Sequence, residues 1–115
     1  MSCSIYLEAI DVEERDDCTE YTYSILEPSD VDELADLVTS LEDFAEKNGA
    51  DIDDIEDLSD IVVVGSLDTE TGVLDISIRF DDTPENTIHV SSRSLNNLSE
   101  DNIFNAIINE LSDTL

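Results

Sequence analysis

The chain has 115 residues, of which 31 are Asp or Glu and only four are Lys or Arg, so its formal net charge at pH 7 is −27. Proteins that bind nucleic acids or anionic membranes directly hold phosphate groups with Lys and Arg, so this composition excludes both kinds of contact. It points instead to basic proteins or cations as partners.

Hydrophobic residues make up 40% of the chain, enough for the core of one domain, and residues 1–115 are expected to form a single acidic domain. No apolar run approaches the roughly 18 residues needed to cross a bilayer. The N-terminus lacks the basic and then apolar pattern of a secretory signal, so a cytoplasmic protein is expected. Cys3, early in a strand, and Cys18, in the turn beyond its far end, are expected to remain free thiols.

The first part of the chain has the alternating pattern of a β-hairpin. Residues 4–12 alternate imperfectly between apolar and polar side chains, and residues 20–26 alternate well. An acidic stretch over residues 13–19 separates the two. We predict two antiparallel strands with the acidic stretch as their connection.

A helix is predicted next, because apolar residues recur at spacings of three and four. Ser29 and Asp32 approximate a capping box at its start, and Asn48 with Gly49 favours its end. Its predicted buried positions are Val31, Leu34, Ala35, Leu37, Val38, Leu41, Phe44 and Ala45.

The second half of the chain predicts three more strands and a second helix. Residues 51–60 suggest a short helical turn or a pinned loop, and the β-branched run over residues 61–67 is typical of a central strand. Residues 73–80 and 86–91 alternate as strands with one covered and one solvated face, and Ser99 caps the last helix. The apolar stripe of that helix is Ile103, Phe104, Ile107, Ile108 and Leu111.

The predicted element order is therefore ββαβββα. It favours an α+β fold in which an antiparallel sheet of about five strands is covered on one face by two packed helices.

Few side chains could support catalysis or hold a metal ion. His89 is the single histidine, and the pattern predicts it on the solvated face of a strand, where a surface role is expected. An acidic run that begins at Asp51 resembles a calcium-binding loop, but its sixth position is Glu56 rather than the required glycine. We expect no enzymatic activity, no cofactor and no dedicated metal site.

The acids are densest between residues 27 and 60, on the outward side of the first predicted helix and in the segment after it. Asp32 and Asp36 are four residues apart, or about 6 Å along a helix axis, which is comparable to the separation of successive phosphates. Like charges at this spacing cost an isolated helix a few tenths of a kcal/mol per pair, so folding does not explain them. The acids predicted to contact a partner are Asp30, Asp32, Glu33, Asp36, Asp43, Glu46, Asp51, Asp53, Asp54, Glu56, Asp57 and Asp60.

The total charge has a DNA-like magnitude, but it allows other interpretations. Duplex DNA carries one charge per roughly 1.7 Å of axis, so a net 27 charges match about 46 Å of duplex, or about 13 base pairs. A halophilic housekeeping or assembly domain, adapted to a salt-saturated cytoplasm, would have the same composition without any partner. A binder of a basic protein that does not compete with DNA is a third interpretation.

In size and charge the chain resembles the acidic DNA-mimic inhibitors of phages and mobile elements, which include anti-restriction and anti-CRISPR proteins. The resemblance covers the whole chain but depends only on its acidic residues, because these families share no motif. It implies a non-enzymatic inhibitor, monomeric or homodimeric, in the cytoplasm of a host cell. The implied target is a basic DNA-binding protein or ribonucleoprotein complex of the host. This is either a CRISPR surveillance complex, blocked in its recognition of the protospacer-adjacent motif or target DNA, or a restriction enzyme.

Overall fold

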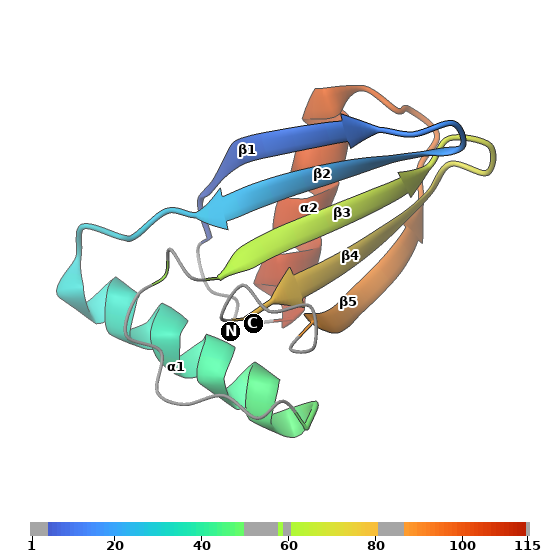
Figure 1. Cartoon of the computed structure of the whole chain (residues 1–115). Coiled ribbons are helices and arrows are strands. Elements are labelled where there is room, and N and C mark those ends of the chain that lie inside the picture. Colours follow the sequence, from blue (N-terminus) through green and yellow to red (C-terminus); the bar gives the residue numbers. More distant parts are fainter. Residues whose placement is uncertain (1–4, 50–57, 59–60, 81–86, 115) are drawn as a thin grey trace.

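The computed structural model describes residues 5–49, 58, 61–80 and 87–114, and its elements follow the predicted order ββαβββα. Five strands form one antiparallel sheet in the spatial order β1-β2-β3-β4-β5 (Figure 1). The predicted α+β fold is confirmed. The elements are β1 (Leu7–Glu14), β2 (Cys18–Ile25), α1 (Val31–Lys47), β3 (Val62–Asp68), β4 (Val73–Arg79), β5 (Thr87–Ser94) and α2 (Glu100–Thr114).

The first hairpin is longer than the sequence pattern indicates. β1 and β2 continue into the acidic stretch, and the connection is closed by the Arg15 backbone N–H, which donates to the Cys18 carbonyl at 2.8 Å. Cys18, predicted in the turn, is the first residue of β2 and carries no disulfide, while Cys3 lies outside the described residues. The prediction of a long acidic connection was wrong because backbone pairing persists between strands whose side chains are charged.

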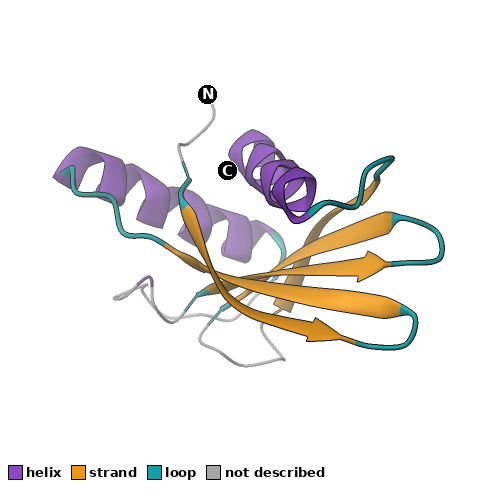
Figure 2. Ribbon diagram, turned by 90° about the horizontal axis from the view of Figure 1, so that it is seen from above, coloured by secondary structure: helices purple, strands orange, loops and turns teal. Residues whose placement is uncertain are grey.

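The helix-covered face of the sheet holds most of the core. Leu74, Ile76 and Ile78 alternate along β4 and are fully buried, as their spacing predicts. Figure 2 shows both helices on the same side of the sheet, and α2 crosses the strands there. Gly65 in β3 permits this close packing, because a Cβ at that position would lie 2.8 Å from Cδ1 of Ile107.

α1 contributes its inward stripe to the same core, with Leu37, Leu41 and Ala45 at most 1% exposed. Two predicted core positions are wrong: Val31 is 78% exposed and Ala35 is exposed. Ala35 is rotated by about 120° from Leu41, the middle of the buried stripe, because successive residues turn by about 100°. Val31 is the first residue of the helix and precedes the first buried residue, Leu37, by more than one turn. Neither helix, nor any other in the described part of the chain, is long and apolar enough to cross a bilayer.

The start and the end of α1 have identifiable caps. The helix is capped by Asp30, whose side chain accepts a hydrogen bond from the Asp32 backbone N–H at 2.8 Å, so the prediction of Ser29 as the cap was wrong by one residue. At the other end, Gly49 has φ of 76°, a left-handed conformation that glycine adopts without strain, and the predicted stop is confirmed.

The other face of the sheet is buried at β3 and exposed at β4 and β5. Val62 and Val64 point away from the helix-covered face, since their neighbour Val63 pairs with Tyr23 and Ile78 of that face. Both are only 8% exposed, as is typical of a β-branched central strand. Asp75 of β4 and His89 of β5 are exposed on that face, as their alternation predicts.

Candidate functional site

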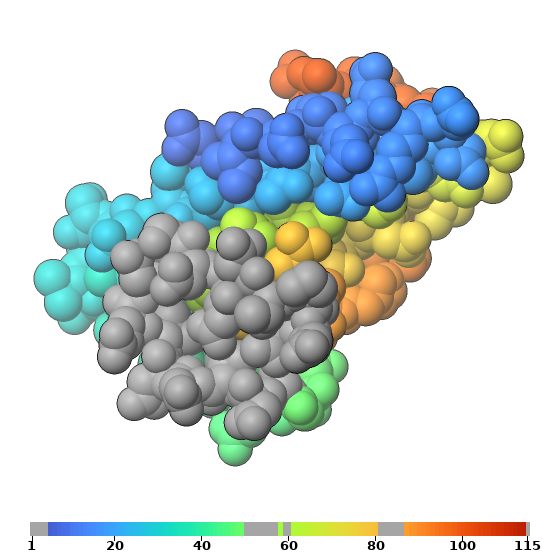
Figure 3. All heavy atoms as spheres, viewed as in Figure 1, coloured from blue at the N-terminus to red at the C-terminus, as the bar shows by residue number. Residues whose placement is uncertain are grey.

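The acids predicted on the outward side of α1 form one exposed surface, which we call the α1 acidic face. Asp32 and Asp36 are four residues apart, and Asp43 follows seven residues later, so all three lie on one side of the helix. In Figure 3 the two ends of α1, coloured cyan and green, are seen at the molecular surface, on the opposite side of the molecule from the tip of the β1–β2 hairpin in blue. The members of the face are all exposed: Asp32, Glu33, Asp36, Asp43 and Glu46.

The α1 acidic face has no cationic partner among the described residues. The ion pairs among the described residues lie elsewhere: two of them join Arg15 to Glu13 and Glu20, at 3.4 and 4.0 Å. The others join Arg93 to Glu110 at 3.5 Å and His89 to Asp75 at 3.7 Å. Lys47, in the last turn of α1, makes none of these pairs. The negative charge of the face is therefore left for solvent, ions or a partner.

The remaining predicted contact residues divide into two groups. Asp30 is exposed, but its carboxylate caps α1, so this acid has a structural role that the others on the helix lack. The acids after the helix, Asp51, Asp53, Asp54, Glu56, Asp57 and Asp60, lie outside the described residues. Their part in the site stays a prediction.

A second acidic region, which the sequence reasoning missed, lies at the tips of the two long hairpins. The N–H and the hydroxyl of Thr69 both donate to the Asp17 carbonyl at 3.1 Å, which joins the β1–β2 turn to the β3–β4 turn. We call its acids the hairpin-tip acids. They are Glu13, Glu14, Asp16, Asp17, Asp68 and Glu70.

The hairpin-tip acids differ from the α1 acidic face because the side chains of two of them, Asp68 and Glu13, have intramolecular partners. The Asp68 carboxylate accepts the backbone N–H groups of Glu70 at 2.9 Å and Thr71 at 3.2 Å, which stabilises the turn. A hydrogen bond and the charge of Glu13 raise the pKa of the Arg15 guanidinium above its ordinary value, with a smaller contribution from Glu20. The signal that could have revealed this region is the presence of acids in both turns, combined with antiparallel pairing of the strands.

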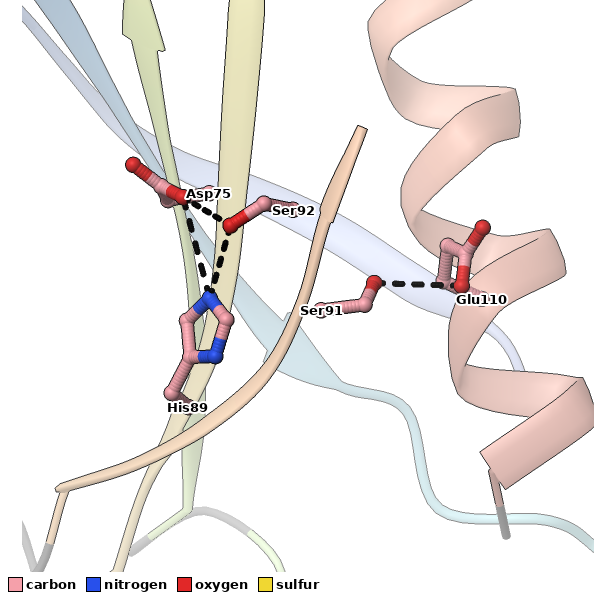
Figure 4. Close-up of polar contacts among 5 residues, drawn as sticks. All are labelled: Asp75, His89, Ser91, Ser92 and Glu110. Carbon is pink, nitrogen blue, oxygen red and sulfur yellow. Dashed lines mark hydrogen bonds and ion pairs between the residues drawn. The ribbon is translucent and has the colours of Figure 1, made fainter. Parts of the chain in front are cut away.

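His89 lies on the solvated face of β5, as predicted, and Asp75 and Ser92 lie beside it (Figure 4). The His89 Nε2 atom is 3.1 Å from the Ser92 hydroxyl and 3.7 Å from the Asp75 carboxylate, and the Ser92 hydroxyl also donates to Asp75. In a Ser-His-Asp catalytic triad the carboxylate holds the other ring nitrogen, Nδ1, so that Nε2 is free to accept the serine proton. Here both partners contact the same nitrogen, which does not match that arrangement.

On the opposite face of β5, two polar side chains bond to α2. A bulge in the β4–β5 pairing places Ser91 opposite Ile76 and Arg93 opposite Leu74, on the helix-covered face. There the Ser91 hydroxyl donates to the Glu110 carboxylate at 3.1 Å, as Figure 4 shows, and Arg93 pairs with the same acid. Glu110 is therefore an acid whose charge is used inside the fold.

No set of three or more His, Cys, Asp or Glu side chains in the described segments is arranged to hold a metal ion. Comparison of the chain with protein-family models, with curated proteins and with solved structures finds no match in any of the three. The functional interpretation therefore depends on the charge and geometry of this chain alone.

Proposed function

We propose that the protein is a non-enzymatic DNA mimic. It binds the positively charged DNA-binding site of a host defence complex in the cytoplasm. The target is a CRISPR surveillance complex, in which it blocks recognition of the protospacer-adjacent motif or target DNA, or a restriction enzyme. The α1 acidic face and the acids after it would pair with the Lys and Arg side chains that otherwise hold phosphates. Long-range attraction between opposite charges would make association fast and dependent on salt.

The observation that supports this proposal most is the uneven distribution of charge between the two helices. Both bury an apolar stripe in one core, but their exposed acids differ in number and position. α1 exposes five acids along its length, whereas the exposed acids of α2 are Glu100, Asp101 and Asp113 at its two ends, with Asn105 and Asn109 between them. A halophilic surface would carry acids at similar density on both solvated helix faces, because its acids serve hydration everywhere. The denser acids of α1 favour a located partner.

The size of the molecule also agrees with the proposal. Its longest dimension is 40 Å, and duplex DNA of that length carries about 24 phosphate charges at one per 1.7 Å. The net charge of −27 is of the same magnitude. The protein thus carries a DNA-like charge over a DNA-like length.

Displacement of DNA tests the proposal. Labelled duplex DNA is bound to each member of a panel of bacterial surveillance complexes and restriction enzymes, and the purified protein is added at about 0.1 M salt, where the Debye length is about 10 Å. We expect release of DNA from at least one complex and weaker release as salt rises. Failure on every member, or retention of DNA in a ternary complex, would remove the support for mimicry, and retention would favour the non-competing binder.

Thermal unfolding at low and at multimolar KCl tests the halophilic alternative. A DNA mimic has to be folded at ordinary ionic strength, so we expect a cooperative unfolding transition in low-salt buffer. A halophilic domain depends on hydrated cations to offset the repulsion among its acids. Unfolding of the protein on transfer to low salt would therefore favour that alternative.

A further inference from the structure

An open cavity of about 180 Å³ lies between β1 and the first turns of α2. Sites for drug-sized ligands occupy roughly 300–1,000 Å³, so this cavity has room for a single side chain or a fragment of similar size. β1 is one of the two edge strands of the sheet, and the cavity therefore lies at the edge of the sheet.

A β-bulge creates the sheet side of the cavity. Ala9 pairs with Tyr23 and Val12 pairs with Tyr21, and the register shifts immediately after Ala9. In a regular strand residues three apart point to opposite faces, so the extra residue, Ile10, places both Ala9 and Val12 on the helix-covered face. The small side chain of Ala9 leaves space there beside the two tyrosine rings.

The helix side of the cavity combines an aromatic ring with two carboxylates. Phe104 contacts Tyr23 with ring centroids 5.6 Å apart and a tilt of 53°. Glu100 and Asp101 line the cavity and are exposed. Burial, followed by the charges of Tyr21 and Glu100, raises the pKa of Tyr23 to about 12. The cavity is thus apolar and aromatic within and negatively charged at its rim.

Three large apolar or aromatic side chains are exposed in β1 or just before it, and one of them, Val12, lines the cavity. Ile10 and Val12 are 54% and 44% exposed, and Tyr6, just before the strand, is 57% exposed. Interface centres in protein complexes combine apolar and tyrosine contacts with arginine anchors. This border therefore has the composition of a partner contact and not only of a solvated edge.

We propose that the cavity binds the side chain of an arginine presented by a basic partner protein. The methylene stem of the arginine would lie along Ala9 and Val12, while its guanidinium would stack on the aromatic rings and pair with Glu100 and Asp101. Arginine fits better than lysine because its planar group both stacks on rings and pairs bidentately with carboxylates. The partner's identity rests on the proposed function, since a site that holds DNA presents arginine side chains.

A titration followed by NMR of backbone amides tests the cavity without any target protein. The probe is N-acetyl-L-arginine amide, and N-acetyl-L-citrulline amide, an uncharged molecule of nearly the same shape, is the control. We expect saturable shifts at the amides of Ala9, Val12 and Phe104 with the arginine derivative and no saturable shift with citrulline. Unsaturable shifts spread over all acidic surfaces would overturn the proposal, because they would show diffuse attraction of a cation.

Two variants and one matched control locate the binding. Ala9→Leu fills the cavity without changing the charge, and Glu100→Gln/Asp101→Asn removes the carboxylates; each should weaken arginine binding at least about tenfold. Asp32→Asn/Asp36→Asn removes the same charge from α1 and should change the affinity less than about twofold. Equal weakening by the α1 variant, or full binding by both cavity variants, would contradict the proposal. If Ala9→Leu fails to fold, the carboxylate variant decides.

This titration and the DNA displacement experiment can fail independently. Saturable arginine binding without displacement of DNA would support the arginine-binding cavity and contradict the DNA-mimic proposal. Displacement of DNA without arginine binding at the cavity would support the DNA-mimic proposal and would contradict the proposal that the cavity binds arginine.

Discussion

The two helices share a core but use their acids differently. α1 buries Leu41 and α2 buries Ile107, each 0% exposed, on the same side of one sheet. Of the four acids of α2, Glu110 bonds to β5, Glu100 and Asp101 line the cavity beside β1, and Asp113 is exposed near the end of the helix. The outward acids of α1 contact no cation among the described residues. An acid without an intramolecular role, at a position where its repulsion opposes folding, is the better candidate for binding a partner.

The largest expected effect is the loss of stability when a buried side chain of either helix is truncated, and it should be similar for α1 and α2. Leu41→Ala and Ile107→Ala should each lower the free energy of unfolding by about 2–5 kcal/mol, because truncation leaves a cavity in a packed core. Urea denaturation of the two variants and the wild type measures this. A loss below about 1 kcal/mol for either variant would show that its helix is not docked as described.

Alkaline pH probes the packing of α2 against β2. Tyr23 is 4% exposed, and its raised pKa of about 12, against an ordinary 10, means that the folded state holds the phenol proton more tightly than the unfolded state. Stability should therefore be complete below about pH 10 and fall by about 2–3 kcal/mol as pH rises to about 12. Denaturant unfolding across this range measures the loss.

Tyr23→Phe should flatten that part of the profile while keeping the ring contact with Phe104, and Tyr6→Phe, at a residue 57% exposed, is the control. An unchanged slope in Tyr23→Phe would show that another group causes the alkaline loss.

Substitutions at the N-caps of the two helices show whether the Asp30 carboxylate has a structural role as a cap. Asp30 caps α1 with a bond of 2.8 Å, and Ser99 caps α2 by accepting the Asn102 N–H at 3.3 Å. Asp30→Ala and Ser99→Ala should each cost about 1 kcal/mol of stability in thermal or urea unfolding. Asp30→Ser should restore α1 without the charge. If Asp30→Ser is as unstable as Asp30→Ala, the carboxylate stabilises the helix through its charge and not as a cap.

The smallest expected effect is the change in stability when one acid of either helix is neutralised, and its sign should differ between α1 and α2. Glu110→Gln removes the pairing with Arg93 and should lower stability by about 0.5 kcal/mol. Asp36→Asn relieves repulsion from Asp32 and should raise stability by a few tenths of a kcal/mol at low salt. Paired urea titrations at low ionic strength compare the two. The same sign for both changes would mean that the acids of α1 and α2 do not differ in their contribution to folding.

Much of the fold was predictable because most elements follow a single helical or strand period. The apolar spacings of Leu37 with Leu41, and of Leu74 with Ile76, identify a helix face and a strand face without any long-range information. The confirmed caps at Gly49 and Ser99 are likewise local. Errors arose where two neighbouring residues suit the same position equally well. Ser29 and Asp30, for example, can both cap a helix.

The candidate site was less predictable because it depends on non-local pairing. The exposed acids of α1 follow from helical periodicity. The bond from Thr69 to Asp17 joins turns 52 residues apart, and nothing in either turn encodes it. The bulge at Ile10 moves Val12 onto the covered face, and the sequence shows it only as an imperfect alternation. These two features produce the hairpin-tip acids and the cavity, the regions that the pattern did not reveal.

The central claim, that the α1 acidic face imitates phosphates, is tested most directly by DNA displacement with a charge-neutralised helix. In Asp32→Asn/Asp36→Asn/Asp43→Asn the fold should persist, while the concentration needed to release duplex DNA from the target should rise at least about tenfold, or about 1.4 kcal/mol. The control, Glu13→Gln/Glu14→Gln/Glu70→Gln, neutralises three hairpin-tip acids. Equal loss in both variants, or displacement by the α1 variant at the wild-type concentration, would contradict the account.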